Sequence, residues 1–571
     1  FMKTRKKWLR KTTAICTAAL LGTAVIPSTA FAADDYASIE KNAWAAAVKN
    51  MASSYAASIE ESQALVSGMQ SDISLKIEDS GRSLLGFVAP FDISWLNDIT
   101  LANTVSFTDG KEGLLMKVLL NDNQICSLEY YLDPESQDVY MRIPELSDKY
   151  FKTNLKEAAD QQASNIESDI EELTPDDTDV DIPTDNFASA YSDSISLSAS
   201  LMSDLSSALP EASVIETLLD KYGSMLFDNL TEGESSQETL TAGDISQDCT
   251  VYEGQISSED AVKTATELLE AAKSDSDIES ILNTWNDKLS SDENLYESFT
   301  TAVDKGLNAL KDTDTSDSED SYLSTKIWVD ENGRIAGRAL EIQEGDTTTP
   351  ILTWQMPENG SDFGYLLTIA SDDINTYSLS GSGQIDGDKL NGTYELSLAD
   401  SISAIIEVKD YDTVSAKEGN LNGNYKITFP SSDTDNEDDY YSSILENFAL
   451  VLDLNSEKDS GSVALSIENA GSTLGTLSIT GGAGEAVEIP DLASLKDVYD
   501  ANNNDDMNAY AATLDFTSIM DNLSKAGVPD EVITYILSGG SATEDSSDTK
   551  ASENSETSDN TSDGSDTDAA A

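Results

Sequence analysis

Apolar and polar residues alternate along almost all of the segment between Tyr322 and Ile489, and this alternation constrains the fold more than any other feature. Examples are Tyr394/Leu396/Leu398 and Val463/Leu465/Ile467. A period of two is typical of a β-strand with one apolar and one polar face. Turn dipeptides such as Asn332-Gly333 separate the runs, as in β-hairpins. We therefore predict about ten or more short antiparallel strands in a sheet that covers a core on one side and meets water on the other.

Helical periodicity marks much of the chain before this array. Apolar residues recur every three or four positions from Trp44 to Ile59, which predicts one N-terminal helix over roughly Asp35 to Val66. Strand-like runs follow between Ile73 and Ile143, and helical spacing returns from Asn154 to Leu310. We therefore predict an α+β fold in which N-terminal and central helices pack a large, curved, half-barrel-like antiparallel sheet.

Shorter elements are predicted within and after these regions. A strand pair is expected near Glu238–Thr241 and Cys249–Ile256, and the spacing of Ile278, Leu282, Trp285 and Leu289 indicates one helix face. Close to the end of the globular part, we predict helices at Ala493–Tyr499 and Phe516–Leu537, with Pro529 near the start of the last helix.

Composition divides the chain into five segments. They are 1–32, a signal peptide; 33–320, the N-terminal helix, first strands and central helical region; 321–490, the long antiparallel strand array; 491–540, the C-terminal helices; and 541–571, an acidic tail rich in Ser, Asp and Thr. The tail has almost no apolar residues. Such a segment cannot bury enough surface to offset the entropy of ordering, so we expect it to be disordered.

The beginning of the chain has the pattern of a secretory signal peptide. A basic leader from Lys3 to Lys11 precedes the apolar run Ala14–Ile26, and Ala30-Phe31-Ala32 forms a small-x-small cleavage site. The apolar run is shorter than the roughly 20 residues that a membrane-spanning helix needs. We therefore predict cleavage after Ala32, a mature chain that starts at Ala33 without a transmembrane anchor, and a secreted, extracellular location.

The chain contains no histidine, which excludes Ser-His-Asp and Cys-His nucleophilic sites and histidine-based zinc sites. Carboxylate pairs for glycan hydrolysis and metal sites with oxygen ligands remain compatible with this composition. The formal net charge is −73. Because so acidic a chain repels nucleic acids and anionic polymers, we expect a partner that is neutral, apolar or cationic.

Cys126 and Cys249 are the cysteines of the predicted mature chain, since Cys16 lies inside the leader. Cys126 alternates with Leu128 and Tyr130 on one strand face, which predicts that its thiol points inward. An extracellular location permits a disulfide between Cys126 and Cys249. Two separate buried thiols are the alternative, and the spacing does not choose between them.

Motif matches are weak throughout the chain. Acidic runs that begin at Asp177, Asp433 and Asp500 have alternating oxygen ligands, but none has the glycine and glutamate of a calcium-binding loop. Ser38 and Lys41 match a Ser-x-x-Lys motif without its companion motifs. With 106 acidic residues, spacing singles out no carboxylate pair. We therefore predict no catalytic residue, no cofactor and no metal site.

Two hairpins share an aromatic-aliphatic-Asp ending, at Tyr131-Leu132-Asp133 and Trp328-Val329-Asp330. The string Val139–Tyr150 and the hairpin Ile327–Arg338 resemble uncharacterised extracytoplasmic proteins of Gram-positive anaerobes. More distantly, they resemble the superfamily of outer-membrane lipoprotein carriers and mycobacterial lipoproteins. This resemblance implies a large curved sheet around an apolar groove that can hold an acyl chain, and it carries over no site residue. The chain lacks the lipid-modified cysteine of those lipoproteins.

These observations favour a secreted, non-catalytic protein that binds a lipid or other apolar or neutral ligand, or a component of the cell envelope. A hydrolase that uses carboxylates on glycans is one alternative, and a structural or adhesion protein is another. An apolar groove would support the first hypothesis, two facing carboxylates in a cleft the second, and a filled core the third.

Overall fold

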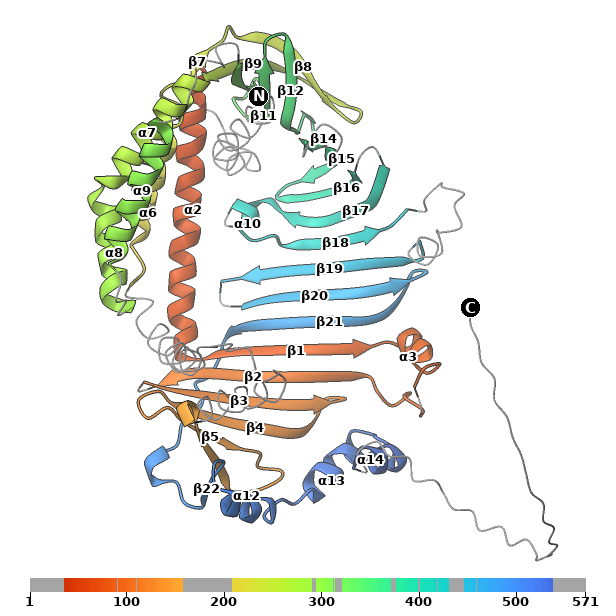
Figure 1. The fold of residues 1–571 in the computed structure, drawn as a ribbon. Coiled ribbons are helices and arrows are strands. Elements are labelled where there is room, and N and C mark those ends of the chain that lie inside the picture. Colours follow the sequence, from red (N-terminus) through yellow and green to blue (C-terminus); the bar gives the residue numbers. More distant parts are fainter. Residues whose placement is uncertain are drawn as a thin grey trace, which may run out of the picture.

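The computed structural model describes residues 35–157, 208–313 and 321–537, apart from gaps at 90, 109, 290–293, 312, 371–375, 399–400, 418, 431–445 and 459. The described part is an α+β fold built on one open, mostly antiparallel sheet of 22 strands (Figure 1). The predicted fold class is therefore confirmed. The predicted signal peptide with its cleavage site between Ala32 and Ala33, and the predicted tail 541–571, lie outside the described residues.

The strands fall into three groups along the chain. The first group is β1 (Met69–Ile77), β2 (Asp98–Thr108), β3 (Lys111–Leu120), β4 (Asn123–Asp133), β5 (Asp138–Arg142) and β6 (Tyr150–Asn154). The second is β7 (Thr231–Glu232), β8 (Ser236–Ala242) and β9 (Ile245–Ser257). The third is β10 (Ser321–Val329), β11 (Ile335–Glu344), β12 (Thr347–Gln355), β13 (Glu358–Asn359), β14 (Asp362–Ala370), β15 (Thr376–Asp386), β16 (Lys389–Leu398), β17 (Ser401–Asp412), β18 (Gly423–Thr428), β19 (Phe448–Glu457), β20 (Ser460–Asn469), β21 (Ser472–Ala483) and, after a gap, β22 (Val498–Asp500).

Pairing between distant strands joins these groups into a single sheet. β1 pairs with β2 on one side and with β21 on the other, and β9 pairs with β10. The spatial order is β22-β6-β5-β4-β3-β2-β1-β21-β20-β19-β18-β17-β16-β15-β14-β12-β11-β10-β9-β8, with β13 beside β14 and β7 beside β9. The segments 33–320 and 321–490 therefore share one sheet.

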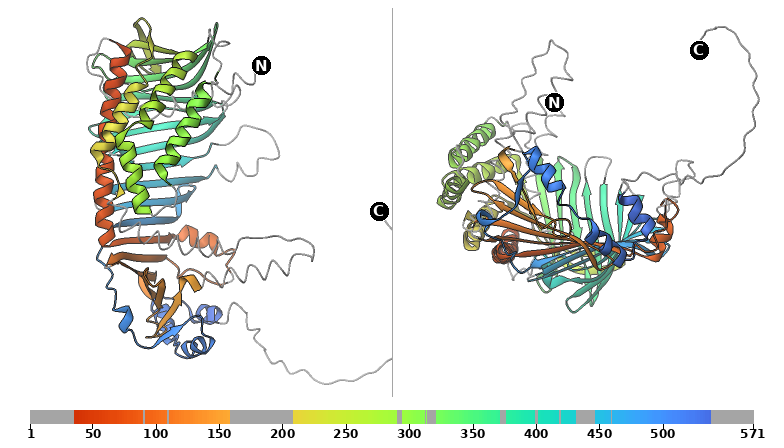
Figure 2. Two further views of the ribbon diagram at one scale, coloured as in Figure 1. Left: turned by 60° about the vertical axis from the view of Figure 1, so that its left-hand side comes forward. Right: turned by 90° about the horizontal axis from the view of Figure 1, so that it is seen from below.

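Most helices lie along one side of the sheet or at one of its ends (Figures 1 and 2). They are α2 (Tyr36–Ser67), α3 (Asp79–Leu85), α6 (Ala212–Met225), α7 (Ser258–Lys273), α8 (Ser276–Leu289), α9 (Leu295–Lys311), α10 (Thr413–Lys417), α12 (Asn504–Ala511), α13 (Thr517–Lys525) and α14 (Asp530–Leu537). α2 runs across the strand direction, while α6 to α9 lie beside it. Within the described residues, no helix combines the length and the apolar character that crossing a membrane requires.

The N-terminal helix α2 lies where the sequence predicts it, but its apolar stripe contacts another helix instead of the sheet. Trp44 and Val48 pack with Phe227, and the indole N–H of Trp44 donates a hydrogen bond to the carbonyl oxygen of Leu219 in α6, at 2.9 Å. The preceding turns of α2, which include Tyr36, contact the sheet. A stripe records which side of a helix is buried, but it does not say against which element.

The predicted C-terminal helices are correct only in part. Ala493–Tyr499 is not a helix, because a short 3₁₀ turn at Leu492–Ser494 leads into β22, which pairs in parallel with β6. Phe516–Leu537 contains α13 and α14, which are separated at Gly527, whose φ of +87° lies in the left-handed region that ends helices. The last helix, α14, begins directly after Pro529, as predicted. Both helices pack with Leu120 at the end of β3 and Ile125 near the start of β4.

Candidate functional site

Alternate side chains on the central strands form a continuous apolar surface. They lie directly opposite one another in rows that cross β2, β1, β21, β20 and β19. We define the apolar face by two such rows: Leu101, Ile73, Ile479, Val463 and Leu454 in the first, and Ile99, Leu75, Leu477, Leu465 and Leu452 in the second. Five strands at the usual spacing make this surface roughly 20 Å wide.

The apolar face is open to solvent, as far as the described residues show. Ile479, Leu75 and Val463 are 45%, 42% and 41% exposed, and Leu477 and Leu465 are exposed to a similar degree. Single exposed apolar residues are common on soluble proteins, but a contiguous patch of this kind usually marks an interaction site.

The opposite face of the same strands is polar. It carries Ser74 and Thr100, whose hydroxyls are 3.0 Å apart, and Ser466 and Thr476, whose hydroxyls are 2.8 Å apart. The alternation in the sequence therefore predicts the two faces correctly. It also predicts a core on the apolar side, and in the described residues that core lies at the two ends of the sheet, against α2 at one end and against α13 and α14 at the other.

Charged side chains are excluded from the apolar face. At the positions in register with its rows on β18 to β21, β1 and β2, the described residues are aliphatic, aromatic or small, with a few uncharged polar side chains. Ionised groups of these strands lie on the polar face instead, as Lys426 and Glu468 do at 2.7 Å from each other. The arrangement suits a ligand that is itself apolar.

The apolar side is filled where β10 to β17 curve around the first turns of α2. Tyr36, Ile39 and Ala43 of α2 are buried against a cluster from these strands that includes Trp354 and Phe363. The filled cluster is continuous with the apolar face through β16 to β18. α2 thus closes one end of the apolar side and leaves the part over β19 to β2 uncovered by described residues.

A buried polar group lies within this filled end. Arg338 of β11 forms an ion pair with Glu40 of α2, and the Tyr36 hydroxyl donates a hydrogen bond to Glu40 at 2.9 Å. The Tyr36 hydroxyl is also 3.0 Å from that of Thr325. Burial and the Glu40 carboxylate raise the pKa of Tyr36 well above its usual value, so its hydroxyl stays protonated.

Tyrosines gather at the boundary between the filled end and the apolar face. Tyr365, Tyr394, Tyr411 and Tyr425 come from β14, β16, β17 and β18 and pack with the same cluster. The rings of Tyr365 and Tyr394 meet edge to face with 5.5 Å between centroids. Burial raises the pKa of all four phenols, so they are neutral donors and acceptors. The hydroxyls of Tyr394 and Tyr411 form no hydrogen bond with a described residue.

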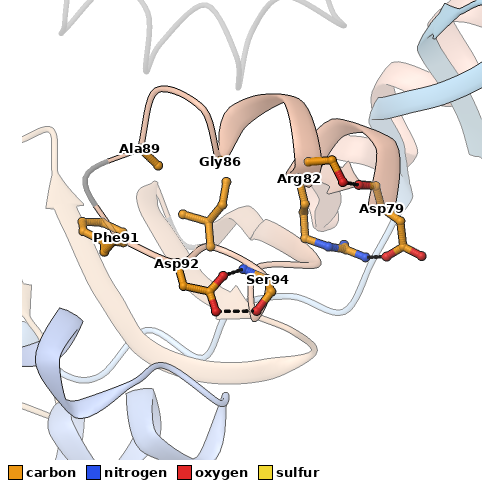
Figure 3. A pocket seen from close by; sticks show the side chains of 9 residues that line it. Asp79, Arg82, Gly86, Ala89, Phe91, Asp92 and Ser94 are labelled. Atoms are coloured by element: carbon orange, nitrogen blue, oxygen red, sulfur yellow. Dashed lines mark hydrogen bonds and ion pairs between the residues drawn. The ribbon is translucent and has the colours of Figure 1, made fainter.

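A separate open pocket of about 580 Å³ lies beside α3 (Figure 3). Its acidic residues are Asp79 and Asp92. Asp79 is paired with Arg82, and Asp92 accepts hydrogen bonds from the backbone N–H and the hydroxyl of Ser94, which lower its pKa. General-acid chemistry needs a carboxyl with a raised pKa, which Asp92 does not have, and Asp79 is held in its ion pair with Arg82.

The two cysteines lie far apart in the sheet and are both free. Cys126 is on β4 and Cys249 on β9, with most of the sheet between them. A disulfide needs Cα atoms within about 7 Å, so of the two alternatives that the sequence left open, the structure has the separate thiols. Cys249 is 2% exposed, whereas Cys126 is only partly buried, so its predicted inward orientation is correct only in part.

The remaining motif residues do not converge on a site. Asp500 accepts a hydrogen bond from the backbone of Asn502 at the start of the turn before α12, and the runs at Asp177 and Asp433 lie outside the described residues. Within the described residues there is no group of three or more metal-ligating side chains. Ser38 and Lys41 do not form a Ser-Lys pair. The Ser38 hydroxyl donates a hydrogen bond to Asp35, and the Lys41 ammonium group donates one to Asp228.

Sequence reasoning missed the residues at the filled end. Nothing in the spacing of Glu40 and Arg338 indicates that they meet, since 298 positions separate them. The tyrosines were visible only as members of alternating runs.

Comparison of the chain with protein-family models, with curated proteins and with solved structures finds no match.

Proposed function

We propose that the protein is a secreted, non-catalytic lipid-binding protein whose apolar face holds the acyl chains of a neutral lipid. The observation that carries this proposal is the uncovered, uncharged apolar face across β19, β20, β21, β1 and β2. One leaflet of a bilayer is roughly 15 Å thick in its hydrocarbon part, so an acyl chain fits within the roughly 20 Å width of the face.

Burial of acyl groups supplies the free energy of binding. Each CH₂ removed from water contributes about 0.8 kcal/mol, and a dozen such groups can offset the loss of translational and rotational freedom. The net charge of −73 disfavours an anionic head group. The neutral hydroxyls of Tyr394 and Tyr411, at the boundary of the filled end, favour a head group that carries hydroxyls, such as a sugar.

Native mass spectrometry tests the proposal directly. The folded protein is incubated with a neutral glycolipid or with phosphatidylglycerol, and we expect a stoichiometric adduct with the former and little with the latter. If neither lipid forms an adduct with folded protein, the proposal is wrong and a structural role is favoured. If activity on a panel of glycans disappears on single Asp or Glu substitutions, the hydrolase alternative replaces it.

A matched pair of variants locates the binding surface. Leu465 and Leu477 lie opposite each other on the apolar face, and Ala464 and Ser478 lie opposite each other on the polar face of the same two strands. We expect L465Q/L477Q to weaken binding of the neutral lipid about tenfold or more, because two apolar contacts are replaced by amides that need water. A464Q/S478Q should bind as the wild type does. Equal loss in both variants would place the lipid elsewhere.

A further inference from the structure

An apolar apex projects from the molecule where β1 ends. It consists of Leu84, Leu85, Gly86, Phe87 and Val88, at the end of α3 and in the turn that follows. Phe87 and Val88 are 87% and 80% exposed, whereas every other large apolar side chain among the described residues is at most 56% exposed. Contact of adjacent Phe and Val side chains with water is unfavourable, and in a monomer in water no other contact offsets this cost.

The base of the apex is held firmly against the sheet. The backbone N–H of Glu78 donates to the carbonyl oxygen of Leu474 at 3.0 Å. A Cβ added at Gly81 would lie 2.1 Å from that same oxygen, so α3 and the beginning of β21 are in the closest contact that glycine allows. Arg82 bonds to the Ile77 carbonyl and to Asp79 at the base, and its charge is therefore directed away from the apex.

The backbone N–H groups in and next to the apex already have hydrogen-bond partners. The N–H groups of Gly86, Phe87, Val88 and Ala89 donate to carbonyl oxygens of Arg82, Leu84 and Leu85, at 2.9–3.3 Å. Entry of a polypeptide into a lipid interface is costly when backbone groups lose water without another partner. These four donors already have partners, so their burial adds no such cost, and the apex presents the exposed side chains of Phe87 and Val88.

We propose that the apolar apex inserts into the surface of a lipid bilayer with a neutral or zwitterionic head-group layer. The shape and the charge of the apex indicate that it contacts a bilayer. A convex tip with two nearly free apolar side chains fits a soft apolar medium better than a preformed protein pocket. The apex has no unpaired cation to attract anionic lipid, and the chain around it is strongly acidic.

The position of the apex relates docking to the proposed lipid binding. α3 follows β1 directly and contacts β21, and these two strands form the centre of the apolar face. A lipid that leaves the bilayer at the apex therefore meets the ends of the strands that would receive it. This last step rests on the proposed function, but insertion of the apex does not.

Vesicle flotation provides the test. The wild-type protein is mixed with phosphatidylcholine vesicles, and the fraction bound is compared with that of F87S/V88S. V414S/L421S is the matched control, because Val414 and Leu421 are 47% and 56% exposed in another part of the surface. We expect F87S/V88S to lower the vesicle partition coefficient about tenfold or more and V414S/L421S to change it less than about twofold.

The outcomes separate docking from lipid binding. F87S/V88S should still form the neutral-lipid adduct when the lipid is supplied in detergent micelles. Loss of that adduct would indicate damage to the apolar face or to the fold, and circular dichroism detects damage to the fold.

Failure of the wild type to bind phosphatidylcholine vesicles, or equal binding by F87S/V88S, would overturn the apex proposal. Stronger binding to phosphatidylglycerol vesicles would overturn its charge argument. Self-association that disappears in F87S/V88S, measured by sedimentation without lipid, would assign the apex to a second copy of the chain instead.

Discussion

Glu40 of α2 and Arg338 of β11 form an ion pair that is almost completely buried, with side chains 0% and 5% exposed. One carboxylate oxygen of Glu40 and two nitrogens of Arg338 have no hydrogen-bond partner among the described residues. The pair joins the beginning of the chain to the middle of the strand array. It holds α2 against the end of the sheet that the helix closes, although burying two incompletely bonded charges is itself costly.

Removal of one partner of this pair should be strongly destabilising. We expect Glu40→Ala to lower the free energy of unfolding by about 3–5 kcal/mol, because Arg338 would remain buried and unpaired. The exposed pair of Lys41 and Asp228 provides the control, and Lys41→Ala should cost about 1 kcal/mol or less. Urea unfolding followed by circular dichroism measures both. If E40M/R338M is no more stable than E40A, the unpaired charge is not the cause of the loss.

A second ion pair predicts a dependence of stability on pH. Burial raises the pKa of Asp275, but hydrogen bonds from Lys221 and Tyr222 outweigh it and lower the pKa to about 2. Because the folded-state pKa lies below the unfolded one, the carboxylate stabilises the fold above about pH 4, and this contribution is lost as the pH falls toward 2.

Asp275→Asn tests this dependence, since the amide can still accept the backbone N–H of Asp277 at the start of α8. We expect the variant to be less stable than the wild type by about 1–3 kcal/mol at pH 7. The difference should shrink in acid, as measured by urea unfolding between pH 7 and pH 3. A difference that stays constant over this range would show that the charge of Asp275 is not responsible.

The contact between α2 and α6 depends on a glycine. A Cβ added at Gly223 would lie 1.8 Å from the indole nitrogen of Trp44. Glycine-to-alanine changes inside helices usually stabilise, but here overpacking should dominate, and we expect Gly223→Ala to cost about 1–3 kcal/mol. Ser224→Ala, at the next position of α6, should change stability by less than about 0.5 kcal/mol. A stabilised G223A protein would show that α6 is free to move away from Trp44.

The two thiols should be separable by reactivity. Burial raises the pKa of both Cys126 and Cys249, that of Cys249 to about 11, and Cys249 is almost inaccessible. We therefore expect both Cys126 and Cys249 to react as thiols in denaturant without reductant, and to be labelled slowly in the native state, with Cys126 reacting first. Mass spectrometry after alkylation counts the sites. A chain that resists alkylation until it is reduced would contain a disulfide and contradict this arrangement.

Local patterns in the sequence were sufficient to predict most elements. The strand pair β8 and β9, the helices α8 and α9 and the hairpins of the long array lie where periodicity places them. The physical reason is that burial on one face imposes a period of two on a strand and of 3.6 on a helix. The prediction failed at Ala493–Tyr499, where pairing of Tyr499 with Phe151 of a distant strand overrides the local preference.

The sequence alone therefore determined the α+β class, the antiparallel strands and the identity of their apolar and polar faces. The tertiary structure decided that β1 pairs with β21, that Glu40 meets Arg338, and that α2 covers one end of the apolar side while Leu75 and Ile479 remain exposed. An alternating strand has the same pattern whether its apolar face is covered by a helix or left open. Only the long-range pairing of strands and the path of α2 decide between these two states, because they bring together residues whose spacing in the chain carries no information about their contact.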